Sequence, residues 1–175
     1  AQLIASTVSP DSFEVTKTFY DNFDYSFAKL RIGRSDDLII VLANYENGLY
    51  EWVSTDKVRI ITNKFGKIVN TFGLESDLDI KNYYINKFSG NYIFNTSFTS
   101  PELNYARTYA EIKLSNRTNF DYLSEEKYIE IFEESISIPS IFWKAKNYYY
   151  FDDGRPLFTR QNIHPNIPQI EIEIY

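Results

Sequence analysis

From Ser26 to the C-terminus, apolar and polar side chains alternate with a period of two residues, which is the pattern of β-strands. The final segment, Gln169–Tyr175, shows it most clearly, with isoleucines on one face and glutamates on the other: Ile170, Ile172 and Ile174 against Glu171 and Glu173. Asp77–Phe88 is ambiguous between helix and strand. Further strands are expected at Leu38–Ala43, Lys57–Asn63, Lys67–Phe72, Tyr92–Phe98, Leu103–Leu114, Tyr128–Ile138, Ile141–Phe151 and Pro156–Ile163.

Short turns separate these segments. Asn47-Gly48 and Asp153-Gly154 accept the positive φ angles of a tight hairpin. An aromatic content of 18% also favours β-structure, because rings fit a pleated, half-buried surface. Many short strands without intervening helices predict an all-β fold. We expect an antiparallel meander that closes into a barrel-like or half-barrel sandwich, because closure removes exposed strand edges.

The N-terminal stretch differs from the rest of the chain. Ser9-Pro10 is typical of a helix start, and we expect a short helix from Pro10 to Lys17. We therefore divide the chain into an N-terminal segment, residues 1–25, and a single β domain, residues 26–175.

The composition argues against several classes of function. The net charge of −6 and the absence of Lys/Arg runs disfavour binding to nucleic acid. With no Cys and one His, His164, the usual zinc sites and most nucleophilic catalysis are excluded, and no metal or cofactor is expected. His164 is interpreted as a loop residue without a catalytic role.

Carboxylates leave one catalytic alternative open, since a glycosidase needs two of them in the right geometry. The candidates are Glu130, Glu133 and Glu134 on a strand and Asp152-Asp153 at a hairpin. The favoured interpretation places these glutamates on a solvated outer face and the aspartates in a turn. We expect a protein that is not an enzyme.

The aromatic segment Tyr148–Phe151 must place two rings on each face of its strand. Rings that point outward suit sugar rings or a protein interface. Candidate glycan- or partner-binding residues are Arg160, Gln161, Tyr148, Tyr150 and Trp143. Alternation from Phe158 leads us to expect Arg160 to be buried and paired with a carboxylate of another strand, with Gln161 on the opposite face.

A second set of residues is expected to be structural: Trp52, Tyr50, Asn47, Gly48 and Gly154. A two-residue turn at Asn47-Gly48 would place Tyr45 opposite Tyr50 and Ala43 opposite Trp52, with Trp52 and Tyr50 in the core.

Two stretches carry a family resemblance. The first, Ala43–Leu74, contains a W-V-S-x-D turn, a Gly hairpin and a closing G-L pair; the second, Tyr148–Ile174, contains an aromatic strand, a D-x-G hairpin, an R-Q pair and an E-I-E strand. The residues are Trp52-Val53-Ser54, Asp56, Gly66, Gly73-Leu74, Tyr149-Tyr150, Asp152, Gly154, Arg160-Gln161, Pro165, Pro168 and Glu171-Ile172-Glu173. In this order they resemble the GfcB/YjbF family of exopolysaccharide-export lipoproteins. Residues 75–137 carry no motif that we align to it.

The resemblance implies a non-catalytic accessory lipoprotein of capsule or exopolysaccharide secretion. It would be held by an N-terminal lipid at the periplasmic face of a Gram-negative outer membrane, with export proteins or polysaccharide as partners. The family's lipid-bearing Cys is absent here. Because the chain has no Met, Ala1 does not derive from a start codon, and we expect a preceding segment to have been removed. A lipocalin-like barrel with a small apolar ligand remains the main alternative.

Overall fold

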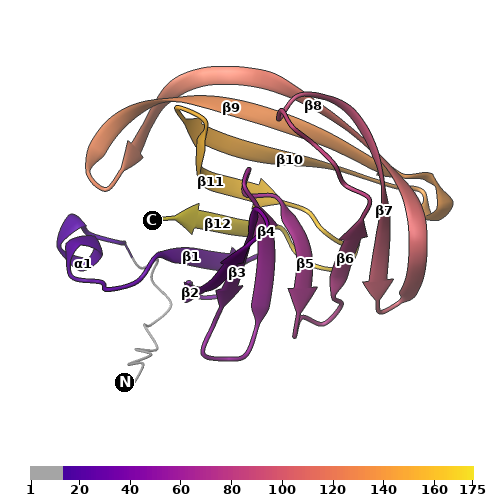
Figure 1. Ribbon diagram of the computed structural model, residues 1–175, viewed down its shortest axis with the longest axis horizontal. Coiled ribbons are helices and arrows are strands. Elements are labelled where there is room, and N and C mark those ends of the chain that lie inside the picture. The colour runs from indigo at the N-terminus through magenta and orange to yellow at the C-terminus, as the bar shows by residue number, and fades with distance from the viewer. Residues whose placement is uncertain (1–13) are drawn as a thin grey trace.

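A computed structural model describes residues 14–175 of the chain. This part forms a closed barrel of twelve antiparallel strands with one short helix (Figure 1). The elements are α1 (Lys17–Asp21), β1 (Phe27–Ile32), β2 (Leu38–Glu46), β3 (Leu49–Val53), β4 (Arg59–Asn63), β5 (Ile68–Phe72), β6 (Leu78–Lys81), β7 (Gly90–Thr99), β8 (Glu102–Tyr122), β9 (Glu125–Ile138), the 3₁₀ turn η1 (Pro139–Ile141), β10 (Trp143–Asp152), β11 (Arg155–Gln161) and β12 (Ile170–Ile174).

The barrel is a meander in which each strand pairs with its neighbours in the chain, and β12 closes it by lying between β11 and β1. Ile172 is opposite Leu30 on one side and Thr159 on the other. The terminal segment is therefore an integral strand, as its alternation predicted. The all-β, barrel-like prediction is confirmed.

The structure corrects one local expectation and resolves one ambiguous segment. The helix begins at Lys17, because the Thr16 hydroxyl caps it by accepting the amide of Phe19 at 3.2 Å. Residues 14–16 are not helical, and the earlier part of the expected helix lies outside the described residues. The ambiguous segment, residues 77–88, contains strand β6 and then irregular chain from Asn82, whose φ is +60°.

The first hairpin also differs from its expected register. Asn47 and Gly48 take φ values of +54° and +78°, and Tyr45 does face Tyr50. A β-bulge between Leu42 and Asn44 then shifts the pairing, so that Trp52 faces Leu42 while Ala43 is exposed.

Trp52 is buried in the barrel core, as predicted, and its indole N–H donates to the Thr62 hydroxyl at 3.0 Å. Tyr50 is only half-buried. Tyr45 is 58% exposed, because the hairpin extends beyond the packed interior.

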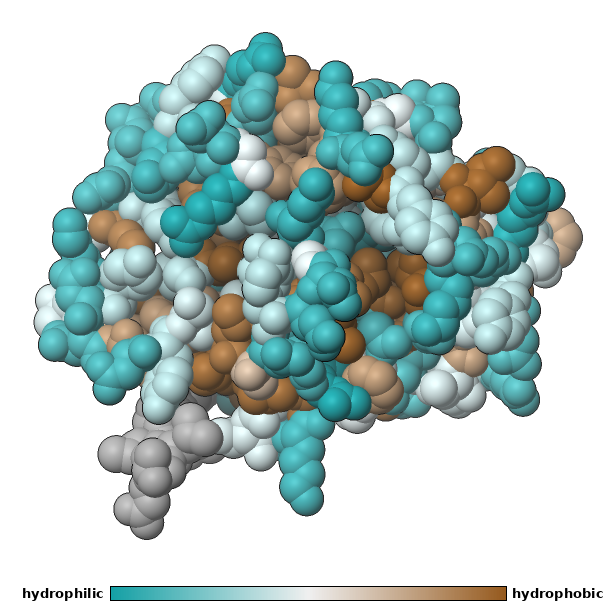
Figure 2. Space-filling model, in the orientation of Figure 1, coloured by the Kyte–Doolittle hydropathy of each residue, from teal (hydrophilic) through white to brown (hydrophobic). Residues whose placement is uncertain are grey.

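A second apolar cluster lies on the outer face of β1. Ala28 belongs to the barrel core, whereas its neighbour Phe27 packs against Tyr175 and the N-terminal segment, and both are buried. The long β8–β9 hairpin bends over the outside of the barrel toward α1 and the C-terminus (Figure 1). At its tip, the Tyr122 hydroxyl donates to the Ile174 carbonyl at 2.7 Å. Figure 2 shows the resulting surface, in which hydrophilic side chains surround smaller apolar areas.

Candidate functional site

The barrel wall separates the candidate binding residues into two groups. Tyr148, Tyr150 and Arg160 lie on the outer face of β10 and β11, because they alternate with the buried Tyr149 and Thr159. Trp143 and Gln161 point inward, where Trp143 packs against the core. The structure therefore brings Tyr148 and Arg160 together, directly opposite each other, and separates them from the other two.

Arg160 is not buried, contrary to the expectation. Its Nε lies 3.0 Å from a carboxylate oxygen of Glu171 on β12, so the predicted carboxylate partner on another strand is present, but 46% of the side chain is exposed. Phe158 does share its face, and the guanidinium lies 5.3 Å from that ring. The face is the outer one, because the barrel interior takes the opposite set of residues from β11.

Arg160 belongs to a row of residues that crosses the outer face from β8 to β1. We call it the charge row; in register order it contains Lys113, Glu133, Tyr148, Arg160, Glu171 and Arg31. Lys146 approaches Glu133 to 3.0 Å, and this hydrogen-bonded ammonium lowers the pKa of the Glu133 carboxyl. The charge row is thus largely self-compensated.

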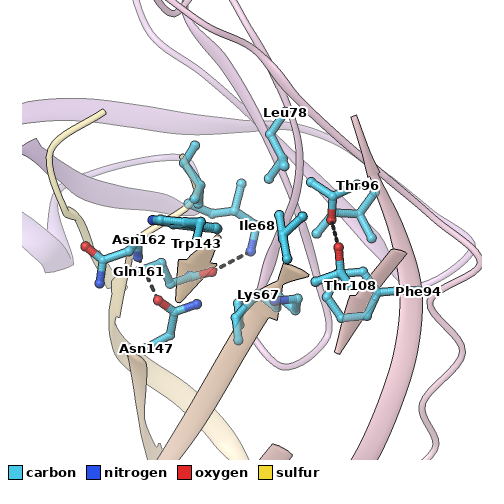
Figure 3. A pocket seen from close by; sticks show the side chains of 14 residues that line it. Lys67, Ile68, Leu78, Phe94, Thr96, Thr108, Trp143, Asn147, Gln161 and Asn162 are labelled. Carbon is cyan, nitrogen blue, oxygen red and sulfur yellow. Dashed lines mark hydrogen bonds between the residues drawn. The ribbon is translucent and has the colours of Figure 1, made fainter. Parts of the chain in front are cut away.

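Gln161 lies on the opposite face from Arg160, as expected, and ties β11 to the β4–β5 turn across the interior. Its amide accepts the Ile68 N–H at 2.9 Å (Figure 3) and donates to the Gly66 carbonyl at 2.8 Å. Gly66 has φ +78°, and an added Cβ would lie 3.1 Å from the Thr159 methyl group. Two residues of the sequence motifs, Gly66 and Gln161, therefore act together in holding the turn against β11.

The barrel interior holds an ion pair that the sequence did not reveal. Glu134 was expected on a solvated face, but its side chain is fully buried and its Oε1 lies 2.8 Å from Lys67 Nζ. Asn147 and the Tyr149 hydroxyl also donate to this carboxylate, at 3.0 and 2.8 Å. Burial, together with the Glu134 charge, raises the pKa of Tyr149, so its hydroxyl stays protonated and remains a donor.

A cavity of about 20 Å³ lies beside this ion pair, between Lys67, Thr96 and Gln161 (Figure 3). This volume suits a single water molecule. The lipocalin-like alternative required an apolar cavity of roughly 300 Å³ or more. The geometry of this cavity therefore does not favour an apolar ligand.

A much larger depression of about 770 Å³ lies across β7–β10. We call it the outer groove. Its outward side chains form two rows in register: Ile93, Tyr109, Ser137 and Lys144 in one, and Asn91, Glu111, Ser135 and Lys146 in the other. The inward neighbours Ala110 and Ile136 are buried and fix which side faces solvent.

The outer groove combines a small polar floor with larger walls. Ser135 and Ser137 leave room above β9, while Tyr109 and Ile93 rise on one side, 41% and 54% exposed, and Lys144 and Lys146 on the other. Such a surface offers hydroxyls and ammonium groups for hydrogen bonds and a ring for stacking. Glu111 is the single carboxylate among its lining residues.

The residues of the outer groove were missed in the sequence. The sequence prediction of a binding site relied on the aromatic run that contains Tyr148 and Tyr150. The pattern that indicates the groove is instead the alternation of Ser135 and Ser137 with buried isoleucines. Small polar residues at outward positions of a long strand leave a depression only if neighbouring strands carry long side chains at the same register.

His164 is buried in its loop, where its Nδ1 accepts the Asn166 amide at 2.9 Å and its ring meets the Phe98 ring. Burial lowers the pKa of its imidazole.

Residues 14–175 contain no group of three His, Asp or Glu side chains arranged to hold a metal ion. They also contain no helix that is both long and apolar enough to cross a bilayer.

A family model described as group 4 capsule polysaccharide lipoprotein GfcB, YjbF matches residues 2–174. The chain belongs to this family. The match extends through residues 75–137, which carried no recognised motif, and confirms the resemblance drawn from the two flanking stretches. GfcB/YjbF membership makes this chain a capsule-associated lipoprotein by family.

The crystal structure of the hypothetical lipoprotein YmcC from Escherichia coli K12 has the same fold. It superposes with a TM-score of 0.75 at 15% sequence identity, covering 90% of this chain and 91% of that chain. Among proteins with curated descriptions, none matches this sequence.

Proposed function

We propose that this protein is a non-catalytic accessory factor of capsule or exopolysaccharide secretion that binds polysaccharide in its outer groove. A lipid anchor would hold the protein at the periplasmic face of the outer membrane; the family's description as lipoproteins supports the anchor. The outer groove carries the proposal: it is open, about 770 Å³ in volume, and floored by two serine hydroxyls beside an exposed tyrosine ring.

The carboxylates of this face support a role without hydrolysis. A glycosidase needs a carboxylic acid with a raised pKa facing a second carboxylate in one cleft. Glu111 is the only carboxylate that lines the groove, and the pKa of the nearby Glu133 is lowered by Lys146. Two other candidates lie on this strand: Glu134 is buried inside the barrel in an ion pair with Lys67, and Glu130 forms an ion pair with Arg117 at 2.9 Å.

Binding is tested with polysaccharide purified from the strain that encodes the protein, by isothermal titration. Ser137→Trp fills the groove floor and should abolish binding. The control is Asn44→Trp, which adds the same ring to an exposed position on β2. In a strain that lacks the gene, the Ser137→Trp protein should fail to restore surface polysaccharide at normal protein levels.

Two results would contradict the proposal. One is equal binding by both tryptophan variants, which would place the contact elsewhere. The other is a shortening of the polysaccharide during incubation with the protein, measured by size-exclusion chromatography, because it would reveal catalysis.

A further inference from the structure

Beyond Ser137 and Lys144, the paired residues at one end of the outer groove, β9 and β10 are joined by a turn in which Phe142 is 97% exposed. Phe142 follows η1 and has φ +54°, a conformation that bulky residues rarely adopt. Tyr105 on β8 is also held at positive φ and is 65% exposed, and η1 contacts β8. Two large aromatic rings are therefore exposed to solvent at this end of the groove. Both residues have a positive φ, which is unfavourable for bulky side chains.

Cationic side chains accompany these rings. Lys144 begins the wall of the groove two residues after Phe142, and Arg107 lies two residues before Tyr109 on the same outward face. Their strands, β8 and β10, are separated by β9, which sets them about 9–10 Å apart. Within residues 14–175 neither cation forms an ion pair, whereas Lys146 and Lys113 are paired with Glu133.

The local charge is opposite to that of the whole chain. The chain has a net charge of −6, yet Arg107 and Lys144 present two uncompensated positive charges around a groove with one lining carboxylate, Glu111. A neutral glycan would use the rings and hydroxyls but leave these cations unused. A polysaccharide with carboxylates at intervals would use the rings and hydroxyls and would also pair with the two cations, since carboxylates accept charge-assisted hydrogen bonds from Lys and Arg.

We propose that the outer groove selects an acidic polysaccharide. The carboxylates of the polysaccharide contact Lys144 and Arg107, and its sugar rings stack on Tyr109 and Phe142. This inference rests on the proposed function and specifies the class of polymer that the same groove takes.

The test compares polygalacturonic acid with its carboxyl-reduced form at matched chain length, and measures binding to the whole protein by isothermal titration. The acidic polymer should bind at least tenfold more tightly, and raising NaCl from 50 to 500 mM should remove most of that difference, because salt screens exposed charges. Lys144→Gln and Arg107→Gln should each weaken binding of the acidic polymer about tenfold. Lys64→Gln, which removes an exposed charge from the β4–β5 turn, should leave binding unchanged.

A separate variant tests the role of the exposed ring. Phe142→Asn removes the ring and places there a residue that accepts positive φ more readily. The variant should melt at the same or a higher temperature while binding both polymers more weakly. Unchanged binding would show that the ring does not contact the glycan.

Failure of this inference and failure of the proposed function give different results. If both polymers and the strain's own polysaccharide bind equally well, the groove binds glycan without selecting acid, and the inference is overturned. If no polysaccharide binds, the proposed function fails as well. Capture of the protein by phosphatidylglycerol vesicles, lost in Phe142→Asn, would assign the rings and cations to a membrane surface instead.

Discussion

Arg160 and Gln161 are neighbours in sequence, yet the barrel gives them opposite environments. Arg160 holds a partly exposed ion pair with Glu171, whereas the amide of Gln161 is sealed between Gly66 and Ile68. Exposed ion pairs contribute little to stability, because water screens them and long side chains lose entropy. A buried donor or acceptor that loses its partner costs far more.

Replacing Gln161 with Leu should therefore lower the free energy of unfolding by about 2–4 kcal/mol, because the Ile68 N–H and the Gly66 carbonyl lose their partner. Arg160→Gln, the adjacent control, should cost about 0–1 kcal/mol. Urea denaturation of both variants measures the difference. Equal costs would mean that water replaces the Gln161 amide.

Substitutions of Lys67 and Glu134 should have non-additive effects on the free energy of unfolding. Lys67→Met leaves the Glu134 carboxylate buried without a cation and should cost about 3–5 kcal/mol. Adding Glu134→Gln removes the charge while keeping an acceptor for Asn147 and Tyr149, and should recover much of that loss. A double-mutant cycle by urea denaturation measures the coupling, and additive costs would contradict it.

His164 should make stability depend on pH. Its pKa is lowered in the folded protein by burial, so the unfolded chain binds a proton more readily. Its contribution is thus fully present above the unfolded pKa of about 6.5 and is lost as the pH falls below that value. In His164→Asn, which can still accept the Asn166 amide, the melting temperature should change less between pH 7.5 and 5.5. Parallel curves for the two proteins would rule out His164 as the source.

At the scale of the elements, β12 is the strand that closes the barrel, since it pairs with β1 and β11. Its inward residues Ile170 and Ile172 are fully buried. Burial of each isoleucine stabilises the fold by about 1.5–3 kcal/mol, and removal of the strand would also open two edges.

Deletion of residues 170–175 should therefore unfold the domain or cause it to aggregate. Far-ultraviolet circular dichroism and size-exclusion chromatography detect these outcomes. A truncated monomer with an unchanged melting temperature would show that β12 is not needed for closure.

At the scale of the whole molecule, residues 14–175 carry apolar clusters both in the barrel interior and outside β1. Phe27 connects the second region to the N-terminal segment, since its ring lies 4.7 Å from that of Phe23 and 5.5 Å from that of Phe19. The barrel closes without these residues, because every strand within residues 14–175 lies after Ser26. We therefore propose that residues 26–175 form the folding unit.

A chain that starts at Ser26 should keep its β-sheet spectrum while losing about 2–5 kcal/mol of stability, because Val15, Phe19 and Phe23 no longer cover Phe27. Binding of the dye ANS should increase at the exposed cluster. Loss of the β-sheet spectrum would instead make residues 1–25 part of the folding unit.

Local patterns in the sequence determined the fold class, most strand positions and two hairpins. This is because a period of two and turns such as Asn47-Gly48 depend on near neighbours.

The tertiary structure decided which face of each strand is covered. The alternation of side chains along a strand places Phe158 and Arg160 on one face and Gln161 on the other. It does not indicate which of the two faces points into the barrel. That choice placed Glu134 in the core and created the outer groove, because closure of twelve strands allots one face to the interior. Contacts such as Lys67–Glu134 join residues far apart in the chain, so no local pattern reports them.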